Sequence, residues 1–495
     1  MDAHATAVAV ISSRVQHFYT TQTPFRLYHG STNSTQHRKL DRNRIIDTSG
    51  LNHVLSVDTE KKTCLVEPNV AMDELVDALV PYGLLPPVVM EFPGITVGGG
   101  FAGTAGESSG FKYGFFDATV NWFEIVLPDG EVAGASEYER PDLFRGAAGT
   151  LGTLGVTTLF ELRLVSYQPF VELTYHPVTS IPDALRTMRS ATTIDNVDFV
   201  DGILFGPNRG VICSGRLVDS TPANTKVQHF SRAKDPWFYI HVERTASRSL
   251  VPVKEWLPVR DYLFRYDRGA FWTGKYAFSY FLTPFNRITR WALDYFMHTR
   301  VMYQALHASG HASKYIVQDL LLPESTAEQF INYISTDFNF WPLWLCPLKV
   351  GNEVAMHPDL AHGAYTEDKT VSFVNVGVWG PGPTNYAKFV DVNRKLEKKV
   401  RELGGIKWLY AQAYYTEEEF WGIYDKRWYD GIREKYKAGY LPDVFQKVRV
   451  DVSKAYAKPA SWSGWVKEVA WGVWPVSGVY GVLKTLYERE YLLAQ

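Results

Sequence analysis

The chain has 495 residues, 51 of them basic and 53 acidic, for a formal net charge of −2. This length exceeds that of one ordinary domain, so two or three domains are expected. The near balance of charge excludes an overall field that would attract nucleic acid or an anionic membrane. Aromatic residues make up 15% of the chain, which fits large cores and also a broad apolar site for a bulky ligand.

The cysteines and the N-terminus exclude further classes of protein. Cys64, Cys213 and Cys346 are far apart and odd in number, so a disulfide framework is not expected and a reducing compartment fits best. No CxxC or HExxH spacing is present, and we therefore expect no metal. The apolar run from Ala5 to Ile11 is too short to span a bilayer and lacks the charged start of a secretory signal.

The first third of the chain alternates strands with short helices. The segment 52–68 predicts two strands joined by a polar turn at Asp58–Lys62. From Ala71 to Val80 apolar residues recur at helical spacing, and Gly83 follows as a stop. Further on, a helix beginning at Asp142 is expected between strands at 122–127 and 156–165.

The pattern changes near Ser166. From Phe170 to about Val450 strands alternate with amphipathic helices, which predicts a second domain of the α+β class. The expected strands are 197–205, 211–216 and 370–379, and the expected helices are 182–190, 325–335, 385–403 and 417–421.

Eight glycines fall between Gly94 and Gly114. The run Gly98–Gly103 formally matches GxGxxG, but prolines precede it and a Gly- and Ser-rich segment follows. Neither the strand nor the helix of a Rossmann unit is therefore expected. Backbone N–H groups without side-chain bulk could instead approach a pyrophosphate or a flat ring. A glycine-rich packing loop is the alternative, and the stretch alone does not decide between them.

A family resemblance becomes specific at this stretch. The run 93–116 (PGITVGGGFAGTAGESSGFKYGFF), then LPDGE and DLFRGAAGTLGTLGVTT, resembles the FAD-binding domain of the vanillyl-alcohol-oxidase-type (PCMH-type) flavoproteins. Within that superfamily it is similar to the Δ24-sterol reductases, the seladin or Diminuto group. The resemblance covers roughly residues 20 to 450, and its later segments are KDPWFYIHVE, VQDLLLP, WPLWLCP and LYAQAYYTEEEFWGIYD.

The resemblance implies a two-domain α+β fold with FAD held in residues 20–165, a substrate or cap domain at 166–455 and a tail at 456–495. It also implies that NADPH transiently delivers hydride to N5 of a non-covalent FAD. The reduced flavin then reduces the side-chain 24(25) double bond of a sterol or related triterpenoid. One alternative is an O2-dependent flavin oxidase or dehydrogenase acting on another hydrophobic or terpenoid substrate. Another is a flavin-free binding protein for hydrophobic ligands.

Cofactor contacts are predicted for the glycine stretch and for one loop on either side of it. The predicted residues are Gly30, Ser31, Thr32, Asn33, Thr96, Val97, Gly98, Gly99, Gly100, Gly103, Thr104, Glu107, Ser108, Ser109, Gly152 and Gly155. His29 and His37 are candidate points of covalent attachment, but the sterol-reductase group that the chain resembles carries no obvious covalent histidine.

Reduction of an unactivated alkene requires a proton source as well as a hydride donor. The candidates for the acid are Glu107, Lys112, Tyr113, Tyr410, Tyr414 and Glu419. The substrate pocket is predicted to include Trp237, Phe238, Trp341, Trp344, Trp408 and Tyr410. Each of these residues could instead cap a turn, bind phosphate or belong to the core.

The tail is rich in tryptophan. Trp462, Trp465, Trp471 and Trp474 fall within 13 residues, with Tyr480 and Tyr487 beyond them. Such a cluster favours a bilayer interface, and a tail docked on the protein's own surface is the alternative. We expect an enzyme that is cytoplasmic or attached peripherally to the cytoplasmic side of intracellular membranes, the endoplasmic reticulum among them.

Overall fold

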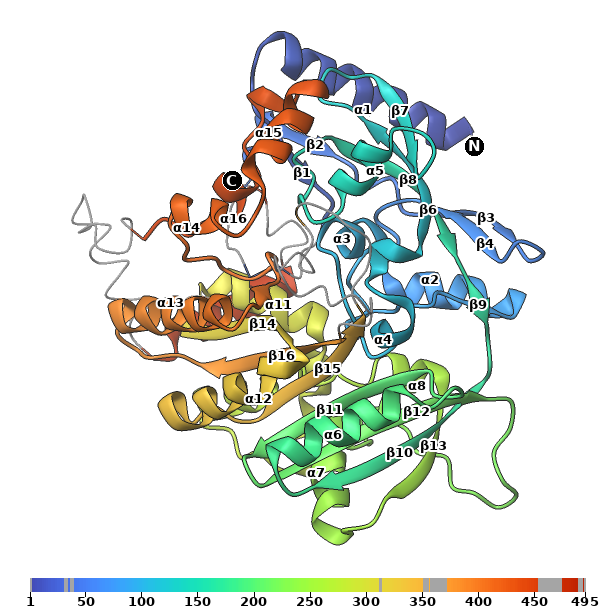
Figure 1. The fold of residues 1–495 in the computed structure, drawn as a ribbon, viewed down its shortest axis with the longest axis vertical. Helices are drawn as coiled ribbons and strands as arrows, with labels where there is room; N and C mark the ends of the chain where they lie inside the picture. The colour runs from blue at the N-terminus through green and yellow to red at the C-terminus, as the bar shows by residue number, and fades with distance from the viewer. Residues whose placement is uncertain are drawn as a thin grey trace.

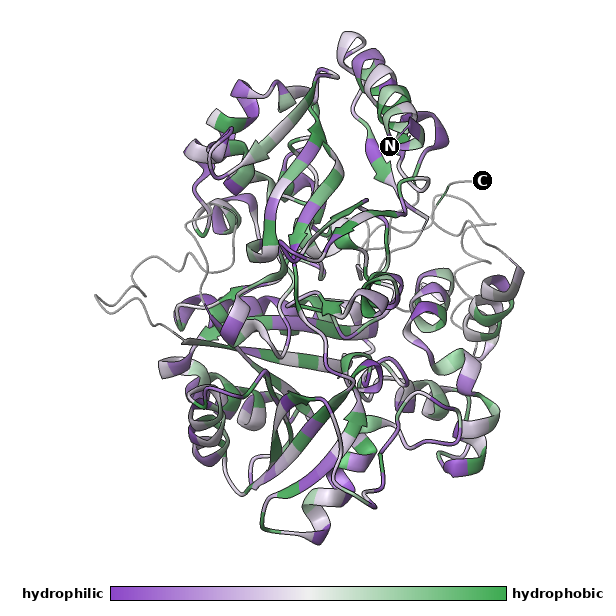
Figure 2. Cartoon of the chain, turned by 90° about the vertical axis from the view of Figure 1, so that its right-hand side faces the viewer, coloured by the Kyte–Doolittle hydropathy of each residue, from purple (hydrophilic) through white to green (hydrophobic). Residues whose placement is uncertain are grey.

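A computed structural model describes residues 2–30, 34–35, 40–310, 314–349, 356, 372–452, 474–487 and 493. Two layered halves are stacked along the long axis of the molecule (Figure 1), one around a five-stranded sheet and the other around an eight-stranded sheet. Figure 2 shows hydrophobic residues concentrated along the strands and hydrophilic residues on the outer helices. The mixed α+β class expected from the sequence is confirmed.

The first half is built on an antiparallel sheet of strand order β3-β4-β8-β6-β7. Its strands are β3 (Val54–Asp58), β4 (Thr63–Val66), β6 (Val120–Val126), β7 (Val132–Ser136) and β8 (Val156–Arg163), beside a parallel pair of β1 (Arg26–Tyr28) and β2 (Ile45–Asp47). The predicted hairpin at Asp58–Lys62 is confirmed, because β3 and β4 pair across it. An N-terminal helix, α1 (Asp2–Thr20), was not predicted, and it buries Val8, Ile11, Val15 and Phe18 along one stripe.

Helix α2 (Met72–Leu79) forms where apolar spacing predicted it. Met72, Leu75 and Leu79 are fully buried along one face, which fits the 3.6-residue period. The chain leaves the following turn at Gly83, whose φ of 70° is left-handed, a conformation that glycine adopts without steric cost. Helix α5 (Pro141–Ala147) forms near the predicted start at Asp142.

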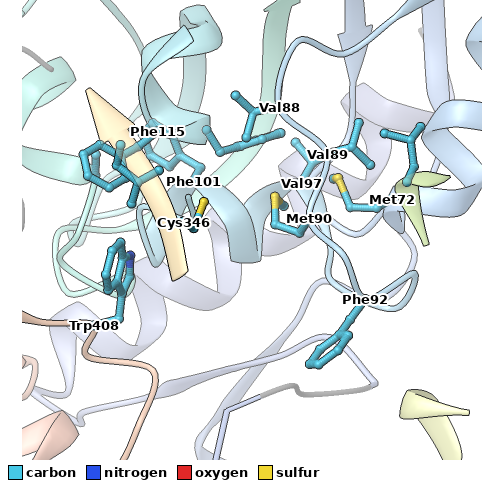
Figure 3. Close-up of a cluster of buried hydrophobic side chains, with 14 of the residues drawn as sticks. Met72, Val88, Val89, Met90, Phe92, Val97, Phe101, Phe115, Cys346 and Trp408 are labelled. Atoms are coloured by element: carbon cyan, nitrogen blue, oxygen red, sulfur yellow. The ribbon is translucent and has the colours of Figure 1, made fainter. Parts of the chain in front are cut away.

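Part of the glycine stretch is helical, at 97–102 and 110–113, and the expectation of a loop is wrong for these residues, whereas 103–109 form turns and irregular backbone. Helix α3 (Val97–Ala102) runs through the glycines, and the Thr96 side chain caps it by accepting a hydrogen bond from the Gly99 amide at 3.1 Å. A Cβ at Gly100 would lie 2.4 Å from Cε of Met90 and 3.2 Å from the Phe116 ring, so glycine lets both side chains pack closely on the helix. Figure 3 shows Met90, Val97 and Phe101 gathered at this helix. Packing and the cap therefore outweigh the low helix propensity of glycine.

The second half contains an antiparallel sheet of strand order β13-β10-β12-β11-β15-β16-β14-β17. The strands are β10 (Phe170–Val178), β11 (Phe199–Gly206), β12 (Arg209–Val218), β13 (Val253–Pro258), β14 (Tyr315–Pro323), β15 (Leu343–Lys349), β16 (Ser372–Pro381) and β17 (Ile406–Lys407). The predicted helices appear as α6 (Ile181–Thr192), α12 (Glu324–Tyr333), α13 (Tyr386–Glu402) and α14 (Glu417–Trp421).

Side chains alternate between the two faces of this sheet. Leu343 and Leu345 of β15 pack in the core shared with α6, α12 and α13. The alternate residues of the same strand, Trp344 and Cys346, belong to the core on the other face of the sheet, toward the first half. The period of two therefore decides which strand residues can face the space between the halves.

The chain returns to the first half near its C-terminus, where α15 (Lys426–Lys435) packs on α5 and is followed by α16 (Val444–Val448) (Figure 1). The hydroxyls of Tyr429 and Thr153 are 2.8 Å apart, and Arg433 donates to the Thr153 carbonyl at 3.1 Å. The limits at residues 165 and 455 stay predictions, while these contacts assign 426–448 to the surface of the first half.

A charged cluster fixes the start of helix α11 (Thr299–Ser309). His298 lies between the carboxylates of Asp267 and Asp294. Hydrogen bonds to Asp267 and then Asp294 raise the pKa of His298 to about 9, against the opposing effect of burial.

We expect His298→Gln to lower the melting temperature by roughly 2–4 °C at pH 6. Because the folded-state pKa is raised, the imidazolium contributes fully below its ordinary pKa of 6.5, and its contribution is lost as pH rises through about 9. Thermal unfolding of both proteins at pH 6 and pH 10 checks this. An equal loss at the two pH values would show that packing, and not charge, is responsible.

Candidate functional site

A cavity of about 370 Å³ lies between the two halves. The first half contributes α3, β1 and the loop after α5, and the second half contributes β14, β15, β16 and the segment 408–410. Glycines and hydroxyl side chains of the first half line one part of the wall, called here the glycine end, and aromatic rings and two carboxyl groups line another part, the aromatic end.

The glycine end contains several of the predicted cofactor residues. Thr96, Gly98, Gly99 and Gly103 line the cavity, together with Gly152 and Gly155 of the second loop. Gly99 is exposed there, and a Cβ added to it would meet only Thr96 Oγ1, at 3.1 Å. A flat ligand could therefore approach the backbone of α3 closely at this point.

The backbone amides of this stretch are already hydrogen-bonded within the protein. Gly98 N donates to the Pro68 carbonyl at 2.7 Å, and Gly103 N donates to the Gly99 carbonyl at 3.0 Å. The expectation that freed N–H groups hold a pyrophosphate is thus not met at these positions. At these positions the glycines provide room for a ligand to approach the backbone, and they do not provide free hydrogen-bond donors.

Positive charge at this end comes from residues that the sequence did not indicate. Arg26 of β1 and Lys447 of α16 both line the cavity, and Lys447 Nζ donates to the Leu151 carbonyl. Cationic side chains near a cavity wall suit the phosphates of a dinucleotide. No local motif marks Lys447, because α16 reaches this site only through the return of the chain.

His29 lines the same end of the cavity. Its buried Nδ1 has no hydrogen-bond partner among the described residues. Burial, and then the charge of Lys447, lower the pKa of His29, so the ring is neutral near pH 7. Gly30 follows with a left-handed φ of 83°, whereas Ser31, Thr32, Asn33 and His37 lie outside the described residues.

The other predicted cofactor residues are buried away from the cavity. Val97 and Gly100 face the core beneath α3, and the Ser109 hydroxyl donates to the Pro87 carbonyl at 2.8 Å. Thr104 donates to the Gly103 carbonyl, and Ser108 accepts from the Tyr262 hydroxyl at 3.3 Å.

The far end of the cavity has rigid aromatic walls. Trp344 donates its indole N–H to Asp201 at 3.1 Å, and Trp408 donates to the Thr104 carbonyl at 2.8 Å. Trp408 also lies against Phe115, with ring centroids 5.9 Å apart (Figure 3). Since these N–H groups are satisfied by the protein, the rings can present apolar surface to a ligand.

The predicted substrate residues divide into two groups. Trp344, Trp408 and Tyr410 line the cavity. Trp237 and Phe238 lie away from it, at the start of α7 (Phe238–Arg248), where Trp237 packs on Phe278 and Phe285. Trp341 packs against the core on the helix-covered face of the large sheet.

Of the predicted acids, Tyr410 alone lines the main cavity, and its hydroxyl donates to Asp319 Oδ2. Glu107 is buried behind the wall, 3.6 Å from Arg265 Nη2. The other predicted acids have structural partners. Lys112 pairs with Asp198 at 2.7 Å and lies over the Tyr113 ring. The Tyr414 hydroxyl donates to Gln412 at 2.6 Å, and Glu419 pairs with Arg394 and caps α14.

The cavity is also lined by two acids that were not predicted from the sequence, Glu91 and Asp319. Burial raises the pKa of Asp319, although hydrogen bonds from Asn375 and Tyr410 oppose the shift. Burial, and then the charge of Glu107, raise the pKa of Glu91. Each is a single carboxyl residue within an apolar run (VMEFP and VQDLLLP). Because acidic side chains are rarely buried without a partner or a role, an acid in such a run is a sequence signal for a functional site.

A buried ion pair lies behind the aromatic end. Arg265 Nη2 is 2.7 Å from Asp201 Oδ2, with side-chain exposures of 1% and 0%. The Tyr266 hydroxyl donates to the same oxygen at 2.6 Å. This cluster holds Trp344 in place through Asp201 and neutralises part of the acid charge beside the cavity.

The chain is similar to one protein family and to several known enzymes. The FAD binding domain family matches residues 3–136. The chain is 29% identical over 426 residues to Delta(24)-sterol reductase of Homo sapiens, covering 83% of this chain and 78% of that protein. It is 28% identical over 437 residues to the enzyme of the same name from Pisum sativum, covering 82% and 76%.

A shorter similarity extends to one further relative. D-lactate dehydrogenase [cytochrome], mitochondrial, of Arabidopsis thaliana is 29% identical over 190 residues, which are 36% of this chain and 33% of that protein. Among the described helices, none is both long enough and apolar enough to cross a membrane.

Proposed function

Since this chain belongs to the PCMH-type FAD-binding flavoproteins, we propose that it reduces the side-chain 24(25) double bond of a sterol or related triterpenoid, with NADPH as electron donor. The similarity to two enzymes named Delta(24)-sterol reductase supports the reaction. The observation that carries the proposal is one continuous cavity that joins a glycine-lined wall of the FAD-binding half to aromatic walls and buried acids.

The residues at the glycine end fit FAD. Arg26 and Lys447 supply positive charge, the exposed Gly99 leaves space against α3, and His29 Nδ1 is a buried polar atom that lacks a protein partner. Bound FAD would supply two-electron hydride chemistry. NADPH would visit the cavity transiently.

We propose that the FAD is bound non-covalently. Acid precipitation of the holoprotein is then expected to release all of the flavin into the supernatant. Flavin that stays with the precipitated chain would contradict this, and His29→Ala would show whether His29 is the point of attachment.

The aromatic end suits a rigid hydrocarbon. The cavity walls there are Trp344, Trp379 and Trp408, each less than a tenth exposed. Such rings exclude water and orient a ligand without conformational cost, because their positions are fixed by packing. A trisubstituted alkene held against them would lie near Asp319 and Tyr410.

The decisive experiment is anaerobic incubation of the purified holoprotein with NADPH and a sterol carrying a 24(25) double bond. The expected product is heavier by two hydrogen atoms, and NADPH oxidation should depend on the sterol. The matched control replaces the sterol with its saturated counterpart. In a parallel aerobic experiment, rapid reoxidation of the reduced flavin by O2 without NADPH oxidation would favour the oxidase alternative. A purified protein without flavin absorption would favour the binding protein.

We also propose peripheral attachment to the cytoplasmic face of intracellular membranes such as the endoplasmic reticulum. Trp474, Leu483 and Tyr487 of the C-terminal segment are half or more exposed, and so are Ile288 and Trp291 of α10 (Arg287–Ala292). Helix α19 (Val476–Tyr487) packs on α11, and Trp474 donates to the carbonyl of Tyr280. Exposed tryptophan and tyrosine favour the bilayer interface. Trp462, Trp465 and Trp471 lie outside the described residues.

Deletion after Pro459 is expected to reduce co-sedimentation with phospholipid vesicles several-fold, because apolar and aromatic surface drives interfacial binding. The control is Tyr138→Ser, which removes a highly exposed tyrosine from the first half. Unchanged co-sedimentation of the truncated protein would rule out the tail as an anchor.

A further inference from the structure

We propose that Asp319 and Tyr410 form the proton donor of the cavity, with Asp319 holding the proton and Tyr410 passing it to a carbon atom of the unsaturated ligand. This inference rests on the proposed function and assigns the acid that the reaction requires.

The large sheet is shaped to receive the Asp319 carboxyl. Asp319 lies on β14, and its cross-strand partner on β16 is Gly377. A Cβ at Gly377 would be 3.1 Å from Asp319 Oδ1, so any larger residue would crowd the carboxyl. The neighbours Leu320 and Leu322 pack on the helix-covered face, and Asp319 lines the cavity.

Both carboxyl oxygens of Asp319 are held by neutral groups. Asn375 Nδ2 donates to Oδ1 at 2.9 Å, and the Tyr410 hydroxyl contacts Oδ2. An O–H···O contact can run in either direction. A protonated Asp319 can therefore donate to Tyr410, whose own O–H then turns into the cavity that it also lines.

The surroundings favour a neutral acid at position 319. The side chain is 8% exposed, and its hydrogen bonds come from an amide and a phenol. Glu107 adds a like charge nearby, and the pKa of Asp319 is raised, mainly by burial. A buried carboxylic acid kept neutral in this way is a suitable general acid near pH 7.

The alkene π pair forms a new C–H bond with the proton of Tyr410, whose O–H bond breaks. Tyr410 recovers a proton from Asp319, which becomes a carboxylate and is later reprotonated from water. The second alkene carbon takes up a hydride with its electron pair from a two-electron reductant of the flavin class.

Glu91 is the competing acid. It is 8% exposed, lines the same cavity and has a raised pKa, first from burial and then from Glu107. What distinguishes Asp319 is its contact with a hydroxyl that also lines the cavity. The experiment therefore includes Glu91→Gln.

The first measurement does not depend on activity. Infrared spectra of the holoprotein at neutral pH should contain the C=O band of a protonated carboxylic acid that is absent from Asp319→Asn and shifted in Tyr410→Phe. A band lost in Glu91→Gln would belong to a separate acid. Identical spectra of the wild type and Asp319→Asn would overturn the proposal. Flavin absorption and melting temperature verify that each variant is folded and loaded.

The second measurement separates the two half-reactions. Reoxidation of the pre-reduced flavin by the alkene should slow by at least about 10²-fold in Asp319→Asn and Tyr410→Phe, and the rate of flavin reduction by NADPH is measured separately in the same variants. The surface variant Asp430→Asn is the control, since it alters only an exposed pair with Lys426. Unchanged reoxidation in Asp319→Asn, or loss confined to Glu91→Gln, would overturn the assignment. If the wild type itself reduces no such alkene, the proposed function is wrong, and the infrared result still decides whether Asp319 holds a proton.

Discussion

Gly99→Leu is expected to give a folded protein that loses FAD. An added Cβ at Gly99 meets only Thr96 Oγ1, so a leucine side chain would extend into the cavity that Gly99 lines. Flavin affinity should fall at least about tenfold, which corresponds to about 1.4 kcal/mol. The flavin-to-protein absorbance ratio after gel filtration measures this, and circular dichroism confirms the fold.

Two other glycine variants make the result specific. Gly431 lies in the surface helix α15, where an added Cβ meets nothing within 4 Å, so Gly431→Leu should keep wild-type flavin content. Gly100→Leu would place its Cβ 2.4 Å from Met90 Cε and 3.2 Å from Phe116, and we expect it to destabilise the fold. A Gly99→Leu protein with full flavin content would show that the cofactor does not contact α3.

Arg265→Met is expected to lower the free energy of unfolding by about 3–5 kcal/mol, because it removes one partner of a buried ion pair. Asp201 would remain buried, 0% exposed, without its cation, and Glu107 would lose a nearby positive charge. Urea unfolding at pH 7 measures the loss. A decrease below about 1 kcal/mol would show that the cluster contributes little to stability.

The loss should depend on pH. Burial raises the pKa of Glu107 and the charge of Arg265 opposes that shift. Without Arg265 the pKa of Glu107 should rise further, so the variant should be less unstable at pH 5 than at pH 8. The double variant Arg265→Met/Asp201→Asn should recover part of the stability, because the unpaired charge is gone. Arg186→Met is the matched control, since its pair with Asp183 is exposed and should contribute about 1 kcal/mol or less.

Local sequence determined the elements whose signals are local. The spacing of Met72, Leu75 and Leu79 specified α2, and the polar turn Asp58–Lys62 specified the β3–β4 hairpin. A period of 3.6 or 2 is set by backbone geometry alone, which is why these elements needed no knowledge of the fold. The run around the glycines likewise located the FAD-binding half, which the family match at residues 3–136 supports.

The conformation of the glycine stretch was not readable in this way. Glycine disfavours a helix by about 1 kcal/mol relative to alanine, and so a loop was the natural expectation. The helix α3 forms because Thr96 caps it and because Gly100 packs on Met90. Met90 and Phe116, the neighbours that select the helix, are brought to it by the fold of the chain.

The chemistry of the cavity was decided by tertiary structure. Asp319, Asn375 and Tyr410 come from β14, β16 and the segment after β17, and only the antiparallel register of the sheet places them together. Lys447 reaches the cofactor end because α16 packs back on the first half. The sequence by itself therefore determined the local elements and the FAD-binding half. Tertiary packing decided which acids and cations face the cavity, because burial and charge at a site depend on contacts between segments that local periodicity does not encode.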